Sequence, residues 1–133
     1  MKLEWMDDIS NGGKTLGVEI DQLVRLYDFD TFQANKLRQS IQQIIIEKRT
    51  SLDLSELDFI ENINCRIILH LAETDTGITR ADKSNFTCSL TIGGYETIAN
   101  LLQPFCIKED IGYQWLYNID TPIDFLFSPG GGW

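Results

Sequence analysis

The chain has 133 residues, of which 43% are hydrophobic and 23% charged, a balance typical of a folded globular domain rather than a disordered segment. Its 20 acidic and 11 basic residues give a formal net charge of −9 at pH 7. Because no dense cluster of lysine or arginine is present to contact phosphates, the charge argues against nucleic-acid binding and favours a basic protein as partner.

The composition also argues against a membrane, a metal and a cofactor. No stretch is apolar enough for a signal sequence or a membrane span, so we expect a cytoplasmic protein with no membrane contact. The three cysteines, Cys65, Cys88 and Cys106, are widely spaced beside apolar residues and are expected to be reduced core cysteines. With one histidine and no Cys-x-x-Cys motif, the chain offers no obvious metal or cofactor site.

Near the N-terminus, residues 12–15 read Gly-Gly-Lys-Thr, which matches the end of a phosphate-binding P-loop. That motif requires a glycine at position 8, where this chain has Asp8, and the carboxylate would oppose a bound phosphate. We therefore interpret Asn11-Gly12 as the turn of a hairpin between residues 2–9 and 15–20.

The next two segments are predicted to be helical. Residues 21–29 have an apolar spacing that fits either a strand or a helix, and we favour a helix because Asp21 can cap it. Residues 30–48 give the clearest helix, with Asp30 as N-cap and Gln33 completing a capping box. Its apolar stripe consists of Phe32, Leu37, Ile41, Ile44 and Ile45.

Strands dominate the middle of the chain. Residues 51–62 fit either a strand with a bulge or a short helical turn. Residues 64–73 and 85–92 alternate apolar and polar side chains, and we expect them to form a long antiparallel hairpin that ends at Gly93-Gly94. A second helix is predicted over residues 95–105, because its apolar residues recur at helical spacing up to Pro104.

A last strand is predicted from Pro122 to Phe127. Together these elements predict an α+β two-layer sandwich, an antiparallel sheet with two main helices on one face, whose strand order stays open. We expect a single domain over residues 1–127 and a glycine-rich tail over residues 128–133, which is free unless Trp133 finds a pocket.

The C-terminal third is unusually rich in aromatic residues beside acids, the residue types that favour a basic protein partner. Its candidate partner-binding residues are Trp115, Tyr117, Asp120, Asp124 and Trp133. The plainer interpretation places most of these aromatic side chains in the core.

The sequence thus favours a small acidic, non-enzymatic protein-binding module, of the inhibitor or immunity-protein type by size and charge alone. One alternative is a small enzyme in which His70 acts as general base with a nearby carboxylate, Asp58, Glu61 or Glu73. Another is a structural homodimer that pairs through an exposed sheet face or through the tail.

Overall fold

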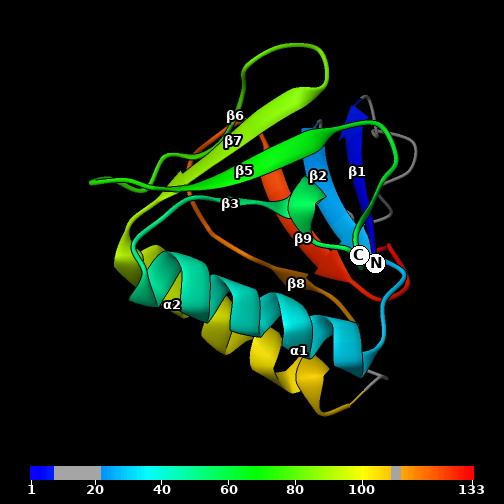
Figure 1. Cartoon of the computed structure of the whole chain (residues 1–133). Coiled ribbons are helices and arrows are strands. Elements are labelled where there is room, and N and C mark those ends of the chain that lie inside the picture. Colours follow the sequence, from blue (N-terminus) through cyan, green and yellow to red (C-terminus); the bar gives the residue numbers. More distant parts are fainter. Residues whose placement is uncertain (8–21, 109–111) are drawn as a thin grey trace.

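A computed structural model describes residues 1–7, 22–108 and 112–133, and it confirms the α+β class (Figure 1). The P-loop-like residues 12–15 and the expected hairpin arm 15–20 lie outside the described residues. In chain order the elements are β1 (Lys2–Asp7), β2 (Gln22–Tyr27), α1 (Thr31–Ser40), a π-helical continuation (Ile41–Glu47), β3 (Leu52–Asp53), a 3-10 turn (Leu54–Glu56), β4 (Glu61–Asn62), β5 (Arg66–Leu71), β6 (Gly77–Arg80), β7 (Asn85–Leu90), α2 (Ile92–Leu102), a 3-10 turn (Gln103–Cys106), β8 (Gln114–Trp115) and β9 (Asp124–Ser128).

The strands form two mixed sheets rather than the one antiparallel sheet that the sequence predicts. The five-stranded sheet has the order β4-β1-β2-β9-β8, and the four-stranded sheet has the order β3-β5-β7-β6. The pairs β1/β4, β2/β9 and β5/β7 are parallel. The expected hairpin of β5 with β7 is therefore wrong, because β6 lies between them in sequence and itself pairs antiparallel with β7. Alternation of side chains is the same in both kinds of pairing, so the pattern could not reveal the direction.

The helix expected over residues 21–29 is also wrong, because Gln22–Tyr27 is strand β2. This strand lies between β1 and β9, and its residues Leu23, Val24 and Leu26 are all buried. A central strand that is covered on both faces does not alternate cleanly in polarity. That double burial explains why the apolar spacing suited a helix as well as a strand.

Both predicted helices exist, although their details differ from the prediction. The capping box at α1 is confirmed, since the Asp30 carboxylate accepts from the Gln33 backbone N–H and the Gln33 side chain accepts from the Asp30 N–H. Phe32 does not join the apolar stripe, because its side chain is 64% exposed. The second helix begins at Ile92 rather than after the glycines, with Thr91 Oγ1 accepting from the Gly94 N–H.

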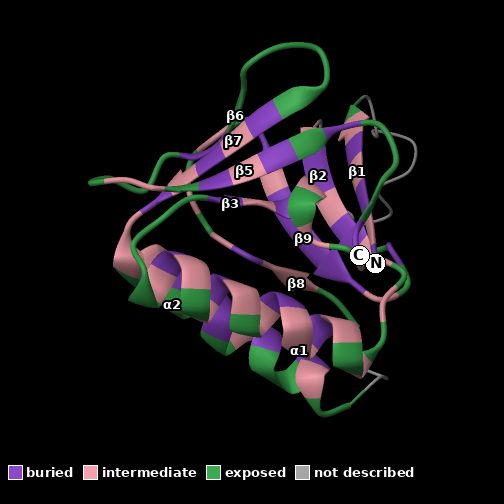
Figure 2. Cartoon of the chain, in the orientation of Figure 1, coloured by how far each residue is buried: buried purple, intermediate pink, exposed green. Residues whose placement is uncertain are grey.

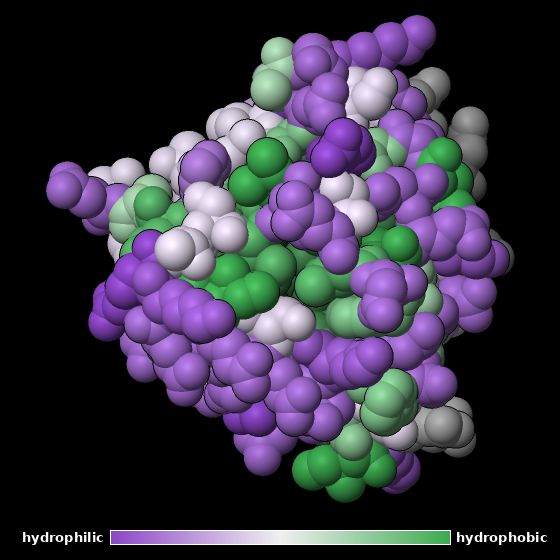
Figure 3. All heavy atoms as spheres, in the orientation of Figure 1, coloured by the Kyte–Doolittle hydropathy of each residue, from purple (hydrophilic) through white to green (hydrophobic). Residues whose placement is uncertain are grey.

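In residues 51–62, where the sequence predicts either a strand with a bulge or a helical turn, the two-residue strand β3 is followed by the helical turn Leu54–Glu56. The two helices lie side by side beneath the inner faces of both sheets, as Figure 1 shows. Figure 2 shows the buried side of each helix turned toward the strands, and the face in Figure 3 is largely hydrophilic over the helices. One core joins the two helices and both sheets through buried residues that include Leu37, Ile45, Tyr95, Leu3, Phe127, Ile67 and Phe86.

Candidate protein-binding face

The outer face of the five-stranded sheet, which points away from the main core, carries a second apolar cluster. Strand register aligns Met6 with Leu23, and Leu23 with Asp124, in one row across this face. The next row aligns Leu126 with Trp115 of the edge strand β8. Because residues in register share a face of a sheet, these side chains gather on the same side.

The centre of this cluster is closed to solvent. Leu23 and Leu126 are both 0% exposed, and Met6, Trp115 and Trp133 pack against them as partly buried neighbours. The rings of Trp115 and Trp133 meet edge to face with centroids 6.0 Å apart. We call the surface formed by Met6, Leu23, Trp115, Asp124, Leu126 and Trp133 the tryptophan face.

An exposed aromatic side chain extends the tryptophan face toward solvent. Tyr113 is 46% exposed, and its ring contacts that of Trp115 in an edge-to-face arrangement with centroids 6.3 Å apart. Edge-to-face contacts of this kind hold aromatic rings in fixed orientations. The result is a row of Tyr113, Trp115 and Trp133 that is partly open to a partner.

The C-terminal residues fold back onto this face instead of extending from it. Ser128 Oγ donates to the Gly132 carbonyl over 2.8 Å, and Arg25 Nη1 donates to the Gly131 carbonyl over 2.7 Å. Gly131 has a φ of +83°, and a Cβ there would lie 2.7 Å from Arg25 Nη1. This left-handed conformation and close approach favour glycine at position 131 and place Trp133 over Trp115.

Asp124 lies at the edge of the tryptophan face with a half-buried carboxyl group. Burial raises the pKa of Asp124 above its ordinary value, because desolvation disfavours the charged form. The nearby Arg25 is already engaged, since its guanidinium pairs with Glu4 and stacks over the Tyr27 ring at 4.0 Å. Among the described residues, Asp124 therefore forms no ion pair.

Two of the five predicted site residues lie elsewhere. The Tyr117 hydroxyl accepts from the Ile78 N–H over 3.1 Å and donates to the Ile123 carbonyl, so it links β6 to the segment before β9. Its ring packs beside Phe125 on the inner side of the sheet. Burial raises the pKa of Tyr117 above its ordinary value. Asp120 is exposed in the connection between β8 and β9.

Three of the predicted partner-binding residues, Trp115, Asp124 and Trp133, lie on the tryptophan face. Its three apolar members Met6, Leu23 and Leu126 were not among the predicted residues. Met6 and Leu23 are 17 positions apart in the sequence, and Leu126 stands between two core phenylalanines, so no local pattern joins the three. A signal was present in the run Phe125-Leu126-Phe127, since three consecutive buried residues in a strand require cover on both faces.

His70 lies on the outer face of the four-stranded sheet and is exposed. Its Nδ1 atom lies 2.6 Å from Ser51 Oγ, within hydrogen-bond distance, and in the described part of the chain its ring makes no hydrogen bond to a carboxylate. The sequence analysis missed this serine because Ser51 comes 19 residues earlier in the chain.

A hollow of about 490 Å³ lies near the start of the chain, lined in part by Lys2, Asp28, Asp58, Phe59 and Glu61. Its Lys2 ammonium already pairs with Asp28 over 3.2 Å.

In the described ranges, histidine, cysteine and acidic side chains form no group of three that could bind a metal ion. Neither described helix has the length and apolar character that a membrane crossing requires.

The chain is therefore defined by its fold as an α+β protein with a second apolar cluster on the outer face of its larger sheet. Comparisons with protein-family models, curated proteins and solved structures found no match.

Proposed function

We propose that this chain is a small, non-enzymatic protein-binding module, of the inhibitor or immunity-protein type, that holds a basic protein with the tryptophan face. The observation that carries the proposal is the contact between Trp115 and Trp133, centroids 6.0 Å apart, beside the half-buried Asp124. Tryptophan and tyrosine are enriched among the residues that dominate binding energy at protein interfaces.

Charge supports the choice of a basic partner. The net charge of −9 attracts a cationic protein at long range and raises the association rate at low salt. At the face itself, Asp124 holds a carboxylate in a partly desolvated place without an ion pair among the described residues. A lysine or arginine from the partner would compensate that charge.

The test is affinity capture from a lysate of the source organism, at low and at high salt, with three immobilised baits. The wild type is compared with Trp133→Ala and with the control Ile107→Ala, which removes an apolar side chain that is 76% exposed on the helix layer. We expect one stoichiometric basic protein on the wild type and on the control, and its loss with high salt or with Trp133→Ala. Equal retention by all three baits would contradict the proposal.

A second candidate function rests on the 2.6 Å contact between Ser51 Oγ and His70 Nδ1, a nucleophile and a base within hydrogen-bond distance. In this candidate enzyme, His70 takes the Ser51 proton as the hydroxyl oxygen attacks an ester carbonyl. The ester C–O bond then breaks, the alcohol leaves with the proton from His70, and water hydrolyses the acyl group left on Ser51. A fluorophosphonate probe that labels the wild type but neither Ser51→Ala nor His70→Ala would favour this enzyme.

The homodimer alternative predicts that light scattering gives twice the monomer mass for the wild type and the monomer mass for Trp133→Ala.

A further inference from the structure

Strand β8 is an edge of the five-stranded sheet, and its backbone on the open side is partly unpaired. The Leu116 N–H donates to the Phe125 carbonyl over 2.9 Å, and the antiparallel register aligns Gln114 with Phe127. In an antiparallel pair, alternate residues direct both backbone groups at the neighbouring strand. The backbone groups of Gln114 and Leu116 therefore face β9, whereas the N–H and carbonyl of Trp115 point away from the sheet.

Only one of these two outward groups is hydrogen-bonded in the described part of the chain. Gln114 Nε2 donates to the Trp115 carbonyl over 2.8 Å, whereas the Trp115 N–H has no partner there. The smaller sheet differs at its edge strand β6, where the outward N–H of Ile78 donates to the Tyr117 hydroxyl over 3.1 Å. An unpaired edge N–H is a template on which a strand of another chain can pair.

The side chains along this edge belong to the tryptophan face. Residues that pair across a sheet share a face, so a residue paired with Trp115 lies beside the Trp115 ring and the half-exposed Tyr113 ring. An arginine there can stack on an aromatic ring. Strand β8 ends at Trp115, so Asp124 has no β8 residue in register with it. An arginine two positions further along an added strand points to the side of the sheet that carries Asp124.

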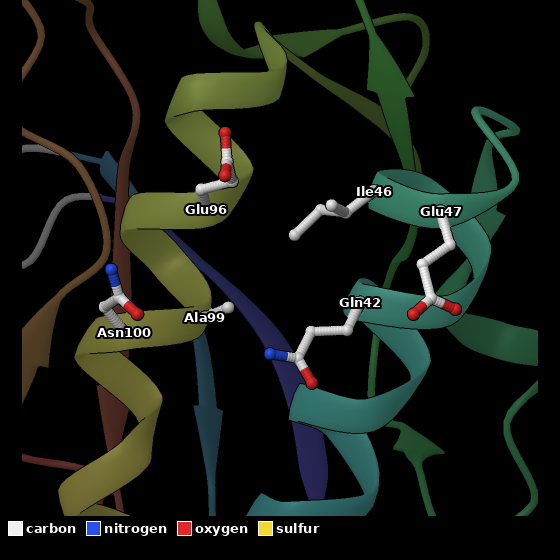
Figure 4. A pocket seen from close by; sticks show the side chains of 6 residues that line it. All are labelled: Gln42, Ile46, Glu47, Glu96, Ala99 and Asn100. Carbon is white, nitrogen blue, oxygen red and sulfur yellow. The ribbon is translucent and has the colours of Figure 1, made fainter.

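The helix layer has no comparable edge, because backbone N–H groups inside a helix are bonded to carbonyls of the same helix. A hollow of about 280 Å³ lies between the two helices. Its two carboxylates, Glu47 and Glu96, stand apart and turn in different directions, as Figure 4 shows. A strand can therefore add to the sheet at β8 but not to the helix layer.

We propose that an extended segment of the basic partner adds to the five-stranded sheet antiparallel to β8, with basic side chains at alternate positions over the tryptophan face. Its backbone accepts from the Trp115 N–H and donates to the Trp115 carbonyl, which exchanges the Gln114 side chain for a backbone donor. Backbone pairing supplies affinity and alternate side chains supply specificity in this mode of recognition. The inference rests on the proposed function, because it states how the partner meets the tryptophan face.

The experiment is an NMR titration of the isotope-labelled chain with the peptide Arg-Val-Arg-Val-Arg, acetylated and amidated at its ends. We expect saturable shifts of the backbone amides of Tyr113, Trp115 and Leu126, and slower hydrogen exchange of the Trp115 N–H. Methylation of the backbone nitrogen of every arginine should weaken binding at least about tenfold, because the antiparallel register directs those N–H groups at β8.

The matched control is the same peptide methylated at the backbone nitrogen of both valines. We expect it to bind within about threefold of the unmethylated peptide, because its methyl groups point away from β8. All three peptides carry the same side chains and charge, so attraction to the acidic chain cannot separate them. Equal binding of the two methylated peptides, or shifts confined to residues outside 112–133, would overturn the inference.

The capture experiment separates this inference from the proposed function. If the wild type captured a basic protein that Trp133→Ala lost, and the titration showed no strand pairing, only the inference would be overturned. If the wild type captured no basic protein, both would be overturned.

Discussion

Replacing Tyr117 by phenylalanine removes one hydroxyl oxygen that is hydrogen-bonded to two buried backbone groups. The Tyr117 hydroxyl accepts from the Ile78 N–H and donates to the Ile123 carbonyl. Ile78 is 1% exposed and Ile123 is 6% exposed, so water has little access to replace the lost bonds. The ring itself stays, because phenylalanine keeps the packing against Phe125 and Gly77.

A buried backbone group that loses its partner costs about 1–3 kcal/mol, and a typical hydrogen bond contributes about 1 kcal/mol net. We therefore expect Tyr117→Phe to lower the free energy of unfolding by about 2 kcal/mol, or to lower Tm by roughly 8 °C. Burial raises the pKa of Tyr117 above its ordinary 10.0, so the unfolded chain ionises first. The advantage of the wild type over the variant should consequently shrink as the pH rises above 10.0.

The assay is urea denaturation followed by tryptophan fluorescence, with Tyr113→Phe as the matched control. Tyr113 is 46% exposed, and within the described residues its hydroxyl forms no hydrogen bond, so its loss should change stability by less than about 0.5 kcal/mol. If Tyr117→Phe were no less stable than Tyr113→Phe, the inference that Tyr117 joins β6 to the larger sheet would be wrong.

Three further outcomes follow from particular contacts. Asp30→Ala should lower the free energy of unfolding by about 1 kcal/mol in urea denaturation, because the α1 capping box is lost. Asp124→Asn should raise the free energy of unfolding at pH 7, because the neutral amide avoids the desolvation cost of the charged carboxylate. Desolvation raises the pKa of Asp124, so this gain should disappear as the pH falls below that raised pKa. A thiol reagent at about pH 8 should modify Cys106 first, because Cys106 is only partly buried whereas Cys65 and Cys88 are buried. Burial raises the pKa of all three thiols, to about 11 for Cys65 and to about 12 for Cys88.

Each of these outcomes has a result that would count against it. Asp58→Ala, which removes an exposed acid outside the helix, is the control for Asp30→Ala, and equal effects would refute the capping contribution. If Asp124→Asn lowered the free energy of unfolding at pH 7, the desolvation cost of the Asp124 carboxylate would have to be offset by a favourable interaction in the folded chain. Fast reaction of all three thiols in the native protein would contradict the burial of Cys65 and Cys88.

Local sequence patterns were sufficient to predict the elements that have one buried and one exposed side. The capping box at Asp30 and the alternation at Cys65, Ile67 and Leu69 predicted α1 and β5 because each element has one buried side. Strand β2 was missed because it is buried on both faces, which erases the alternation. Register and strand direction depend on contacts between distant segments, and no spacing within one segment reports them.

The candidate site shows the same difference between local sequence patterns and contacts of distant segments. Aromatic content pointed to Trp115 and Trp133, but only the pairing of β8 with β9 shows that Trp115 shares a face with Leu126. The same composition also selected Tyr117, whose hydroxyl is used inside the molecule.

The most direct test of the binding proposal is hydrogen–deuterium exchange of the chain with and without the basic protein that the wild-type bait captures. We expect slower exchange on binding in residues 113–116 and 124–133, which carry most of the tryptophan face, and unchanged exchange in β5, which contains His70. Protection confined to β5 or to other segments, with residues 113–116 and 124–133 unaffected, would contradict it.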